Sequence, residues 1–476
     1  MTEKTPQGAA APTSKDTSSA AENAAVVHDR MDSLNAGLES LKHKTMGKTN
    51  FFEELTWRRM LHDSMPGTDK LLNTEKVRGY IGFDPTADSL GVGNLVQVMT
   101  LLHFQRAGHT PIVLVGGATG MVGDPSGKSE ERNLLDADSL QQNLAGQRKQ
   151  LERLLDFSGS NAAELVNNYD WFKDISFLDF IRDAGKHLSV NYMMAKDSVK
   201  KRISGADHEG MSFTEFTYQL IQGYDFFHLW KHKGVKLQMG GSDQWGNITT
   251  GTELIRRKAA GDAYALTTQL IQKADGTKFG KTEKGNLWLD PKRTSPYEFY
   301  QFWLNASDED VKRYVRIFTL LDRETVEGME KEHDAAPQNR LLQKTLAKDI
   351  TTRVHGQEEL DFALSATELL FGKGTIDQLK SLTEERFVSV FVGAGVPVAE
   401  LPRDALTAGV NVVDLFSRLI ESKSEVHRQL KGNSLSLNKE KVTDGKLTIG
   451  ADKLINGRYL LLQKGKKDYC LVKVVG

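Results

Sequence analysis

The sequence lacks several features that would assign it to a class at once. It holds a single cysteine, Cys470, among 476 residues, which excludes an internal disulfide framework and a cysteine-rich metal site. No run of about 18 apolar residues occurs, so we expect no membrane span. The N-terminal segment lacks a hydrophobic signal core, and Glu3 and Asp16 argue against a transit peptide. We therefore expect a cytoplasmic protein in a reducing compartment.

The chain as a whole also lacks an excess of acidic or basic residues, since its formal net charge is −1. Its distribution is uneven, however. From Lys431 to Gly476, ten lysines and arginines stand against four acidic residues. Such a basic excess at one end of a neutral chain is typical of a small nucleic-acid-binding module. On charge alone, a merely solvated surface explains it equally well.

Hydrophobic patterning begins only after an N-terminal extension. Residues 1–26 are rich in Ala, Ser, Thr and Pro and contain no aromatic residue, so we expect disorder there, and residues 27–49 are at most partly helical. From residue 50, a strand over 76–85 is followed by an amphipathic helix over 94–108 that ends at Gly108.

Two further apolar runs complete the pattern. Residues 112–115 form a continuous apolar run that glycines stop, and residues 235–239 form another that ends in Gly-Gly. Runs of this kind are typical of strands buried on both faces of a parallel sheet. We predict a doubly wound α/β domain over 50–268, with its ligands beyond the carboxyl ends of the strands.

The rest of the chain changes character twice. After residue 296, apolar residues recur at helical spacing, and a stretch with Pro397 and Pro402 resembles a linker. Two short helices and several strands are predicted to follow it. We expect a loop and linker at 269–296, a helical domain at 297–392, a linker at 393–408 and a last domain at 409–476.

One glycine-rich stretch, GMVGDPSGKS at 120–129, imitates a phosphate-binding P-loop. The P-loop pattern requires a glycine five positions before Gly127, where this chain has Val122. Asp124 and Pro125 also suit a ring of amide donors poorly, because proline has no N–H and a carboxylate repels phosphate. The P-loop interpretation therefore fails.

A second candidate for phosphate chemistry is KFGKT, residues 278–282. Its two lysines are predicted to present paired ammonium groups on a loop, and compact point charges suit a polyphosphate. Two lysines at this spacing are common on solvated turns, so the motif is weak by itself.

Five motifs in a fixed order carry more weight than any one of them. They are GFDPTADSLGVGN at 82–94, GGATGMVGDPSGKSEER at 116–132, FTYQLIQGYDF at 216–226, LQMGGSDQWGN at 237–247 and KFGKT. In this combination the chain, over residues 50–476, strongly resembles the bacterial tyrosyl-tRNA synthetases, which are class I aminoacyl-tRNA synthetases. GVGN stands in the place of the family's HIGH motif and KFGKT in that of KMSKS.

The resemblance implies a fold and a reaction. The expected fold is a Rossmann-type catalytic domain, an α-helical anticodon domain and a small α+β RNA-binding domain. Tyrosine is expected to attack the α-phosphate of ATP and release pyrophosphate, and the tyrosyl adenylate then esterifies tRNA. The protein must orient two bound molecules and stabilise charge on the leaving phosphates.

The resemblance also implies site residues. The tyrosine-binding residues would be Tyr80, Asp124, Tyr218, Gln222, Asp225 and Gln244. Of these, Tyr218, Gln222 and Asp225 are spaced so that they share one helix face. The catalytic residues near the phosphates would be Thr86, Asn94, Lys128, Arg132, Lys278, Lys281 and Thr282. The ATP-binding residues would be Gly82, Asp84, Gly91, Gly93, Asp243 and Lys281.

The chain departs from the family at the HIGH motif. Gly91 replaces the first histidine and Asn94 the second. An asparagine amide can donate as an imidazole N–H does, whereas Gly91 has no side chain to donate. Losing a contact made only in the transition state reduces rate more than binding. We expect a working enzyme that is slow at adenylate formation.

The last domain resembles the RNA-binding domain of ribosomal protein S-four, which assigns Arg418, Arg428 and Lys431, with His427 nearby, to tRNA phosphate. The family is homodimeric, so a homodimer is implied. ATP is expected as its Mg²⁺ complex, with no tightly bound cofactor and no protein metal site. Two alternatives stay open: a tryptophanyl-tRNA synthetase, which Asp225 with Tyr80 disfavours, and a non-catalytic RNA-binding relic, which the retained lysines disfavour.

Overall fold

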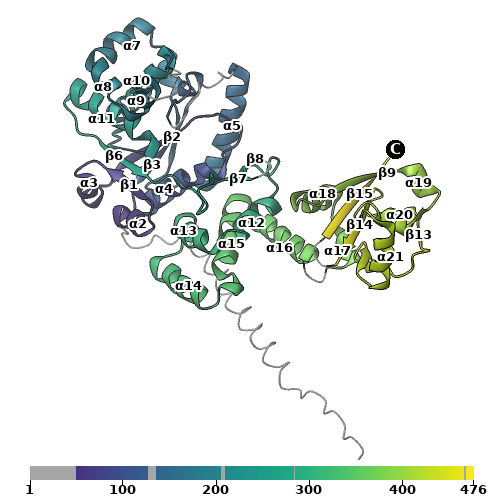
Figure 1. The fold of residues 1–476 in the computed structure, drawn as a ribbon. Helices are drawn as coiled ribbons and strands as arrows, with labels where there is room; N and C mark the ends of the chain where they lie inside the picture. The colour runs from purple at the N-terminus through teal and green to yellow at the C-terminus, as the bar shows by residue number, and fades with distance from the viewer. Residues whose placement is uncertain (1–49, 127–135, 205–209, 283–284, 372–373, 466–467) are drawn as a thin grey trace, which may run out of the picture. The chain divides into compact units, whose positions relative to one another are not determined.

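The computed structural model describes residues 50–126, 136–204, 210–282, 285–371, 374–465 and 468–476 (Figure 1). Within them lies a six-stranded sheet in the order β1-β6-β5-β2-β3-β4. All neighbouring strands are parallel except β1 and β6. The strands are β1 Leu61–Ser64, β2 Arg78–Phe83, β3 Thr110–Val115, β4 Glu164–Asn167, β5 Leu237–Gly241 and β6 Tyr264–Thr268.

The strand order creates a switch point between β2 and β5. The chain runs from β2 to β3 and β4 on one side and returns to β5 and β6 on the other. Every residue of β3 and β5 is buried, as the continuous apolar runs predict. Loops diverge at the carboxyl ends of β2 and β5, and ligands of such sheets bind in that crevice.

Helices cover this sheet (Figure 1). The principal ones are α4 Leu95–Arg106, α5 Ala137–Leu154, α10 Phe213–Lys233 and α11 Trp245–Ala259, with α2 Phe51–Trp57 and α3 Thr68–Thr74 near β1. Four short helices lie between β4 and α10 in the chain: α6 Tyr169–Phe172, α7 Phe177–Asp183, α8 Val190–Met194 and α9 Asp197–Ser204. A Ser212–Glu215 capping box starts α10, and Gly234 ends it at φ 65°.

A hairpin and a run of helices follow the sheet. The hairpin pairs β7 Lys281–Thr282 with β8 Gly285–Asn286. Ser295 caps the next helix, which has Pro296 at its first turn, where the missing N–H costs nothing. The helices are α12 Pro296–Leu304, α13 Asp308–Phe318, α14 Arg323–Ala335, α15 Leu341–His355, α16 Gln357–Phe371, α17 Ile376–Ser381 and α18 Glu384–Gly393.

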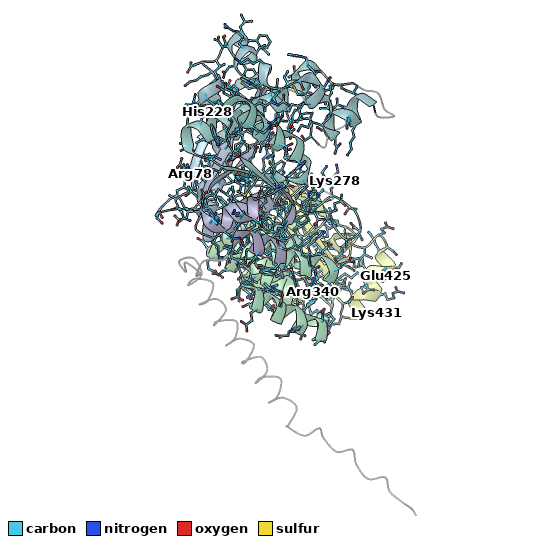
Figure 2. All side chains as sticks on the ribbon, turned by 90° about the vertical axis from the view of Figure 1, so that its left-hand side faces the viewer. Arg78, His228, Lys278, Arg340, Glu425 and Lys431 are labelled. Atoms are coloured by element: carbon cyan, nitrogen blue, oxygen red, sulfur yellow. The ribbon has the colours of Figure 1, made fainter. Side chains whose placement is uncertain are left out.

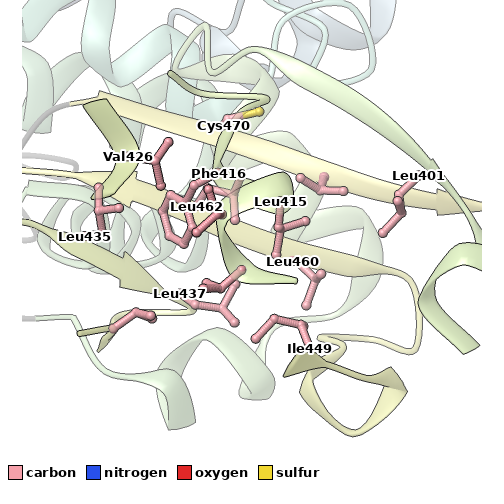
Figure 3. Packing of buried hydrophobic residues seen from close by; sticks show 14 of the residues in the cluster. Leu401, Leu415, Phe416, Val426, Leu435, Leu437, Ile449, Leu460, Leu462 and Cys470 are labelled. Atoms are coloured by element: carbon pink, nitrogen blue, oxygen red, sulfur yellow. The ribbon is translucent and has the colours of Figure 1, made fainter. Parts of the chain in front are cut away.

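The C-terminal region has a second sheet in the order β12-β11-β14-β15-β9. Its apolar core, shown in Figure 3, includes Phe416, Leu460 and Cys470, and the cysteine is 1% exposed. The strands are β9 Val398–Pro402, β11 Leu435–Leu437, β12 Glu440–Lys441, β14 Tyr459–Lys464 and β15 Asp468–Val475; β10 Val410–Asn411 pairs separately with β13 Thr448–Ile449. The helices are α19 Arg403–Thr407, α20 Val412–Phe416 and α21 Lys423–Lys431.

The linker expected at 393–408 was wrong in part. Residues Val398–Pro402 form β9, which pairs in parallel with β15 and buries Leu401 in the core. Pro397 precedes β9 and Pro402 is its last residue. On an edge strand a proline loses no ladder hydrogen bond, so neither proline prevents strand pairing. The sheet therefore begins before residue 409.

Candidate active site

The crevice at the switch point contains a buried group of polar side chains. Tyr218 on α10 donates from its hydroxyl to Asp84 Oδ2 at 2.8 Å, just beyond β2. Asp225, two turns further along α10, accepts from Asn168 Nδ2 at 3.1 Å and from Trp171 Nε1 at 2.9 Å. The structure therefore places Tyr218 and Asp225 on the crevice side of α10, as their spacing predicts.

Tyr80 on β2 completes this group. Its ring packs edge-on against Phe226, with centroids 5.5 Å apart, and its hydroxyl is buried without a hydrogen-bond partner among the described residues. A buried hydroxyl normally has a partner, because leaving it unpaired costs free energy. Tyr80 thus presents, beside Asp225, a hydroxyl that no described residue pairs with.

Burial dominates the electrostatics of the crevice. It raises the pKa of Asp225 to about 8, although Asn168 and Trp171 oppose the shift by hydrogen bonding to the carboxylate. Burial, aided by the charge of Asp225, raises the pKa of Tyr80 well above its usual value. Burial likewise raises the pKa of Tyr218, with Asp84 and Asp124 adding to the effect. The crevice therefore favours neutral acids and a hydroxyl-bearing ligand.

A second group surrounds Asp124. Its carboxylate accepts from Gln244 Nε2 at 2.7 Å, from Asn247 Nδ2 at 3.3 Å and from the Ser126 backbone N–H at 2.9 Å. The structure therefore brings Asp124 and Gln244 together, as expected. Gln222, one turn beyond Tyr218, is half-buried on α10. An ammonium group suits a carboxylate held in this way.

The nucleotide side of the crevice is built from backbone and short polar side chains. Gly82 is the exposed residue in the otherwise largely buried β2, and Asp243 exposes its side chain just after β5. Thr86 is exposed beyond β2. These positions border the crevice that the strand order creates.

The GVGN segment forms a short turn before α4. Gly91 donates its backbone N–H to Asn94 Oδ1 at 3.0 Å. This contact occupies the amide oxygen, so the Asn94 amide nitrogen is the group left to donate outward. Gly93 and Asn94 are both exposed at this helix start, where backbone N–H groups favour an anion.

The KFGKT loop lies against that turn. A Cβ added to Gly280, which has φ 77°, would lie 3.4 Å from the Gly93 backbone nitrogen, and Leu287 donates its backbone N–H to Gly280 O at 2.9 Å. Phe279 packs in the opposite direction against Tyr314 and Phe318, with centroids 5.0 and 5.5 Å away. Lys278, labelled in Figure 2, and Lys281 are exposed. Thr282 donates to Gly285 O at 3.2 Å.

Two predicted phosphate-binding residues, Lys128 and Arg132, lie outside the described residues. In the C-terminal region, Arg418, Arg428 and Lys431 are all exposed. Arg428 pairs with Glu425 at 2.5 Å, and Figure 2 labels Glu425 and Lys431 on α21. The cations expected to contact RNA thus face solvent.

Sequence reasoning missed several residues of the crevice. Thr119 donates to Asp84 Oδ1 at 2.7 Å and accepts from Asn168 at 3.1 Å, so it links the half-buried Asp84 through Asn168 to the buried Asp225. Asn168 follows β4, and its place at the carboxyl end of a strand was a usable signal. No comparable sequence feature indicated the roles of Trp171, Asn247 and Phe279.

Comparisons with known proteins give consistent matches. The family model described as tRNA synthetases class I (W and Y) matches residues 72–372, and the model for the tyrosine–tRNA ligase SYY-like C-terminal domain matches 389–472. The chain is 58% identical over 428 residues to the tyrosine–tRNA ligase of Bacteroides fragilis, covering 89% of this chain and 99% of that protein. A similar match, 58% over 430 residues, links it to the ligase of Cytophaga hutchinsonii. Among solved structures, a C-terminally truncated mitochondrial tyrosyl-tRNA synthetase from Aspergillus nidulans is 30% identical with a TM-score of 0.61, covering 68% of this chain and 94% of that one.

Proposed function

Because the chain belongs to the class I tRNA synthetases of the W and Y family and is a tyrosine–tRNA ligase, we propose roles for its individual residues in that reaction. The enzyme activates L-tyrosine with ATP to tyrosyl adenylate and pyrophosphate, then transfers tyrosine to tRNA. The match to tyrosine–tRNA ligases over 89% of this chain argues against the tryptophanyl alternative, and the match of the synthetase family model to residues 72–372 argues against a non-catalytic RNA-binding relic.

The tyrosine phenol is bound by Asp225 and Tyr80. The observation that carries this assignment is the unpaired Tyr80 hydroxyl beside a carboxyl that Asn168 and Trp171 hold in place. A phenylalanine ligand would leave these buried groups unpaired. Enzymes of this family prefer tyrosine over phenylalanine roughly 10⁵-fold, because a bound phenylalanine leaves these polar groups unpaired. The ammonium group of tyrosine is bound by Asp124, Tyr218, Gln222 and Gln244.

The phosphates of ATP, which arrives with Mg²⁺ as part of the substrate, lie at the start of α4. Lys278, Lys281 and Thr282 approach them from the KFGKT loop, and Thr86 and Asn94 bind them from the other side. Lys128 and Arg132, which lie outside the described residues, are further phosphate ligands in this proposal. The nucleoside is faced by Asp243 and by the backbone near Gly82, Asp84, Gly91 and Gly93. Charge developing on pyrophosphate is stabilised by these fixed donors.

Tyrosine-dependent exchange of pyrophosphate into ATP tests the pocket assignment. We expect exchange with tyrosine and none with phenylalanine or tryptophan, and Asp225→Asn and Tyr80→Phe should each raise the KM for tyrosine while leaving the KM for ATP unchanged. Wild-type discrimination retained in both variants would remove these residues from the phenol pocket.

We further propose that the enzyme is a cytoplasmic homodimer. Three side chains between β4 and α10, Phe177, Leu178 and Val190, are 65%, 71% and 63% exposed, which is unusual for large apolar groups so close in the chain. A second copy of this chain covers these three side chains in the dimer. Leu178→Glu should therefore yield monomers, which light scattering would detect. A wild-type monomer would contradict the proposal. In the described residues, no helix is long and apolar enough to cross a membrane.

The C-terminal region binds tRNA through Arg418, Arg428 and Lys431. Their exposure and the basic excess around them support contact with phosphate. Replacing Arg418 and Lys431 by alanine should weaken tRNA binding and reduce its salt dependence, with pyrophosphate exchange unchanged. Unchanged tRNA affinity would contradict this assignment.

A further inference from the structure

Trp171 is held at two points by one face of α10. Its indole Nε1–H donates to Asp225 Oδ1 at 2.9 Å, and its ring stacks on His228 with centroids 4.4 Å apart and an interplanar angle of 13°. Asp225 and His228 are three residues apart on the helix, so their side chains are neighbours. The indole therefore contacts both the Asp225 carboxyl in the crevice and the His228 imidazole, which lies one turn further along α10 and is labelled in Figure 2.

We propose that His228 is a positioning residue for tyrosine recognition: its imidazole fixes the tilt of Trp171 at which the indole N–H donates to Asp225. This inference rests on the proposed role of Asp225 as the group that receives the substrate phenol. A tilted indole would leave one carboxyl oxygen without its donor and allow the carboxyl to rotate away from the phenol.

The local structure explains why Trp171 depends on such support. The helix that carries it, α6, is a single turn of four residues. The other donor to Asp225, Asn168, is itself anchored, because its Oδ1 accepts from the Ala118 backbone N–H at 2.7 Å and its Nδ2 also contacts Thr119. The indole N–H has no second hydrogen bond to any residue that the structure describes, so the orientation of its ring depends on the surfaces packed against it.

His228 is suited to stacking in its neutral form. Burial, with the nearby charges of His232, Lys231 and Lys233, lowers the pKa of His228 to about 4. At neutral pH the imidazole is therefore an uncharged flat ring, and aromatic pairs of this kind gain from parallel contact. His232 lies against the same imidazole at an interplanar angle of 39°, with centroids 4.5 Å apart, and supplies a matched control.

The test compares His228→Ala, His228→Phe and His232→Ala with wild type in pyrophosphate exchange. We expect His228→Ala to raise the KM for tyrosine about three- to tenfold, the effect of one weakened hydrogen bond, and to narrow the preference for tyrosine over phenylalanine. The KM for ATP should stay constant. His228→Phe keeps a flat ring and should restore both values, and His232→Ala should behave as wild type.

The outcomes separate this inference from the assignment on which it depends. If Asp225→Asn impairs tyrosine selection but His228→Ala does not, the positioning role is wrong while the pocket stands. If His228→Ala changed the KM for tyrosine and the KM for ATP equally, or if His228→Phe failed to restore the wild-type values, His228 would serve packing alone. If Asp225→Asn itself leaves tyrosine selection intact, the pocket assignment fails first.

Discussion

Gly91 faces Trp288 across an isolated antiparallel bridge beside the start of α4. The bridge is closed by hydrogen bonds from Val92 N to Leu287 O and from Leu289 N to Leu90 O, both 2.9 Å. Gly91 and Trp288 thus form the pair without mutual hydrogen bonds, the closer of the two antiparallel types, in which side chains lie side by side. A side chain at position 91 would project next to the indole.

This geometry leaves room for the histidine that Gly91 replaces. The backbone at Gly91 has φ −89° and ψ 166°, which any residue adopts, and an added Cβ would lie 3.5 Å from Leu287 O and 3.8 Å from Asn94 Oδ1. Gly91→His should therefore fold normally. We expect it to raise the kcat of pyrophosphate exchange about tenfold or more, because the ring adds a donor near the phosphates.

Gly91→Ala is the control for that substitution, since it adds the Cβ without the donor. Its exchange rate should match that of the wild type. An equal gain in both variants would attribute the effect to backbone rigidity, and no gain with histidine would refute the hypothesis that the glycine slows adenylate formation.

Tyr80→Phe should separate stability from binding. The wild-type hydroxyl is buried without a partner among the described residues, so its removal should raise the free energy of unfolding of the ligand-free protein by about 1 kcal/mol. Tyrosine binding should weaken about tenfold, because the phenol loses a partner. Urea denaturation and equilibrium dialysis measure the two quantities.

Tyr297→Phe provides the comparison, because Tyr297 is buried on α12, outside the crevice. It should leave tyrosine binding unchanged. A loss of stability in Tyr80→Phe, with binding intact, would mean that the hydroxyl has a structural partner and no ligand role.

The fold was predicted where local pattern decides structure. The strands β3 and β5 were predicted because strands buried on both faces have continuous apolar sequences, and Tyr218 and Asp225 share a face because helical spacing requires it. The contacts of Thr119, Asn168 and Trp171 join segments that only the closed sheet brings together. The linker prediction was wrong at Val398–Pro402 because proline was given more weight than the edge position of the strand permits.

The raised pKa of Asp225 predicts a specific pH dependence of stability. Burial raises this pKa from an ordinary 3.8 to about 8, so between those values the folded protein binds more protons than the unfolded chain. The folded state is therefore favoured below about pH 4 and progressively loses that advantage up to about pH 8.

Comparison with Asp225→Asn isolates this effect, because asparagine does not titrate and the other groups are shared. The free energy of unfolding of the wild type relative to the variant should fall by a few kcal/mol, to order of magnitude, between about pH 4 and pH 8 and then level off. Denaturation across this range measures it. A difference that does not depend on pH would show that the carboxyl is ionised in the folded protein throughout.

Phe279 anchors the KFGKT loop, which carries Lys278 and Lys281, to the helices α12 and α13. Its ring lies within 6 Å of the rings of Trp303, Tyr314 and Phe318, at centroid distances of 5.9, 5.0 and 5.5 Å. Removal of the ring by Phe279→Ala should lower stability by about 1–3 kcal/mol and leave the loop without its anchor. We expect the KM for ATP to rise and kcat to fall, while tyrosine affinity stays constant, because Asp225 and Tyr80 lie outside this aromatic cluster. Phe279→Leu retains apolar contact and should recover most of the stability and part of the rate. If Phe279→Ala instead lost affinity for tyrosine as well as for ATP, the ring would support the whole crevice and not the loop alone.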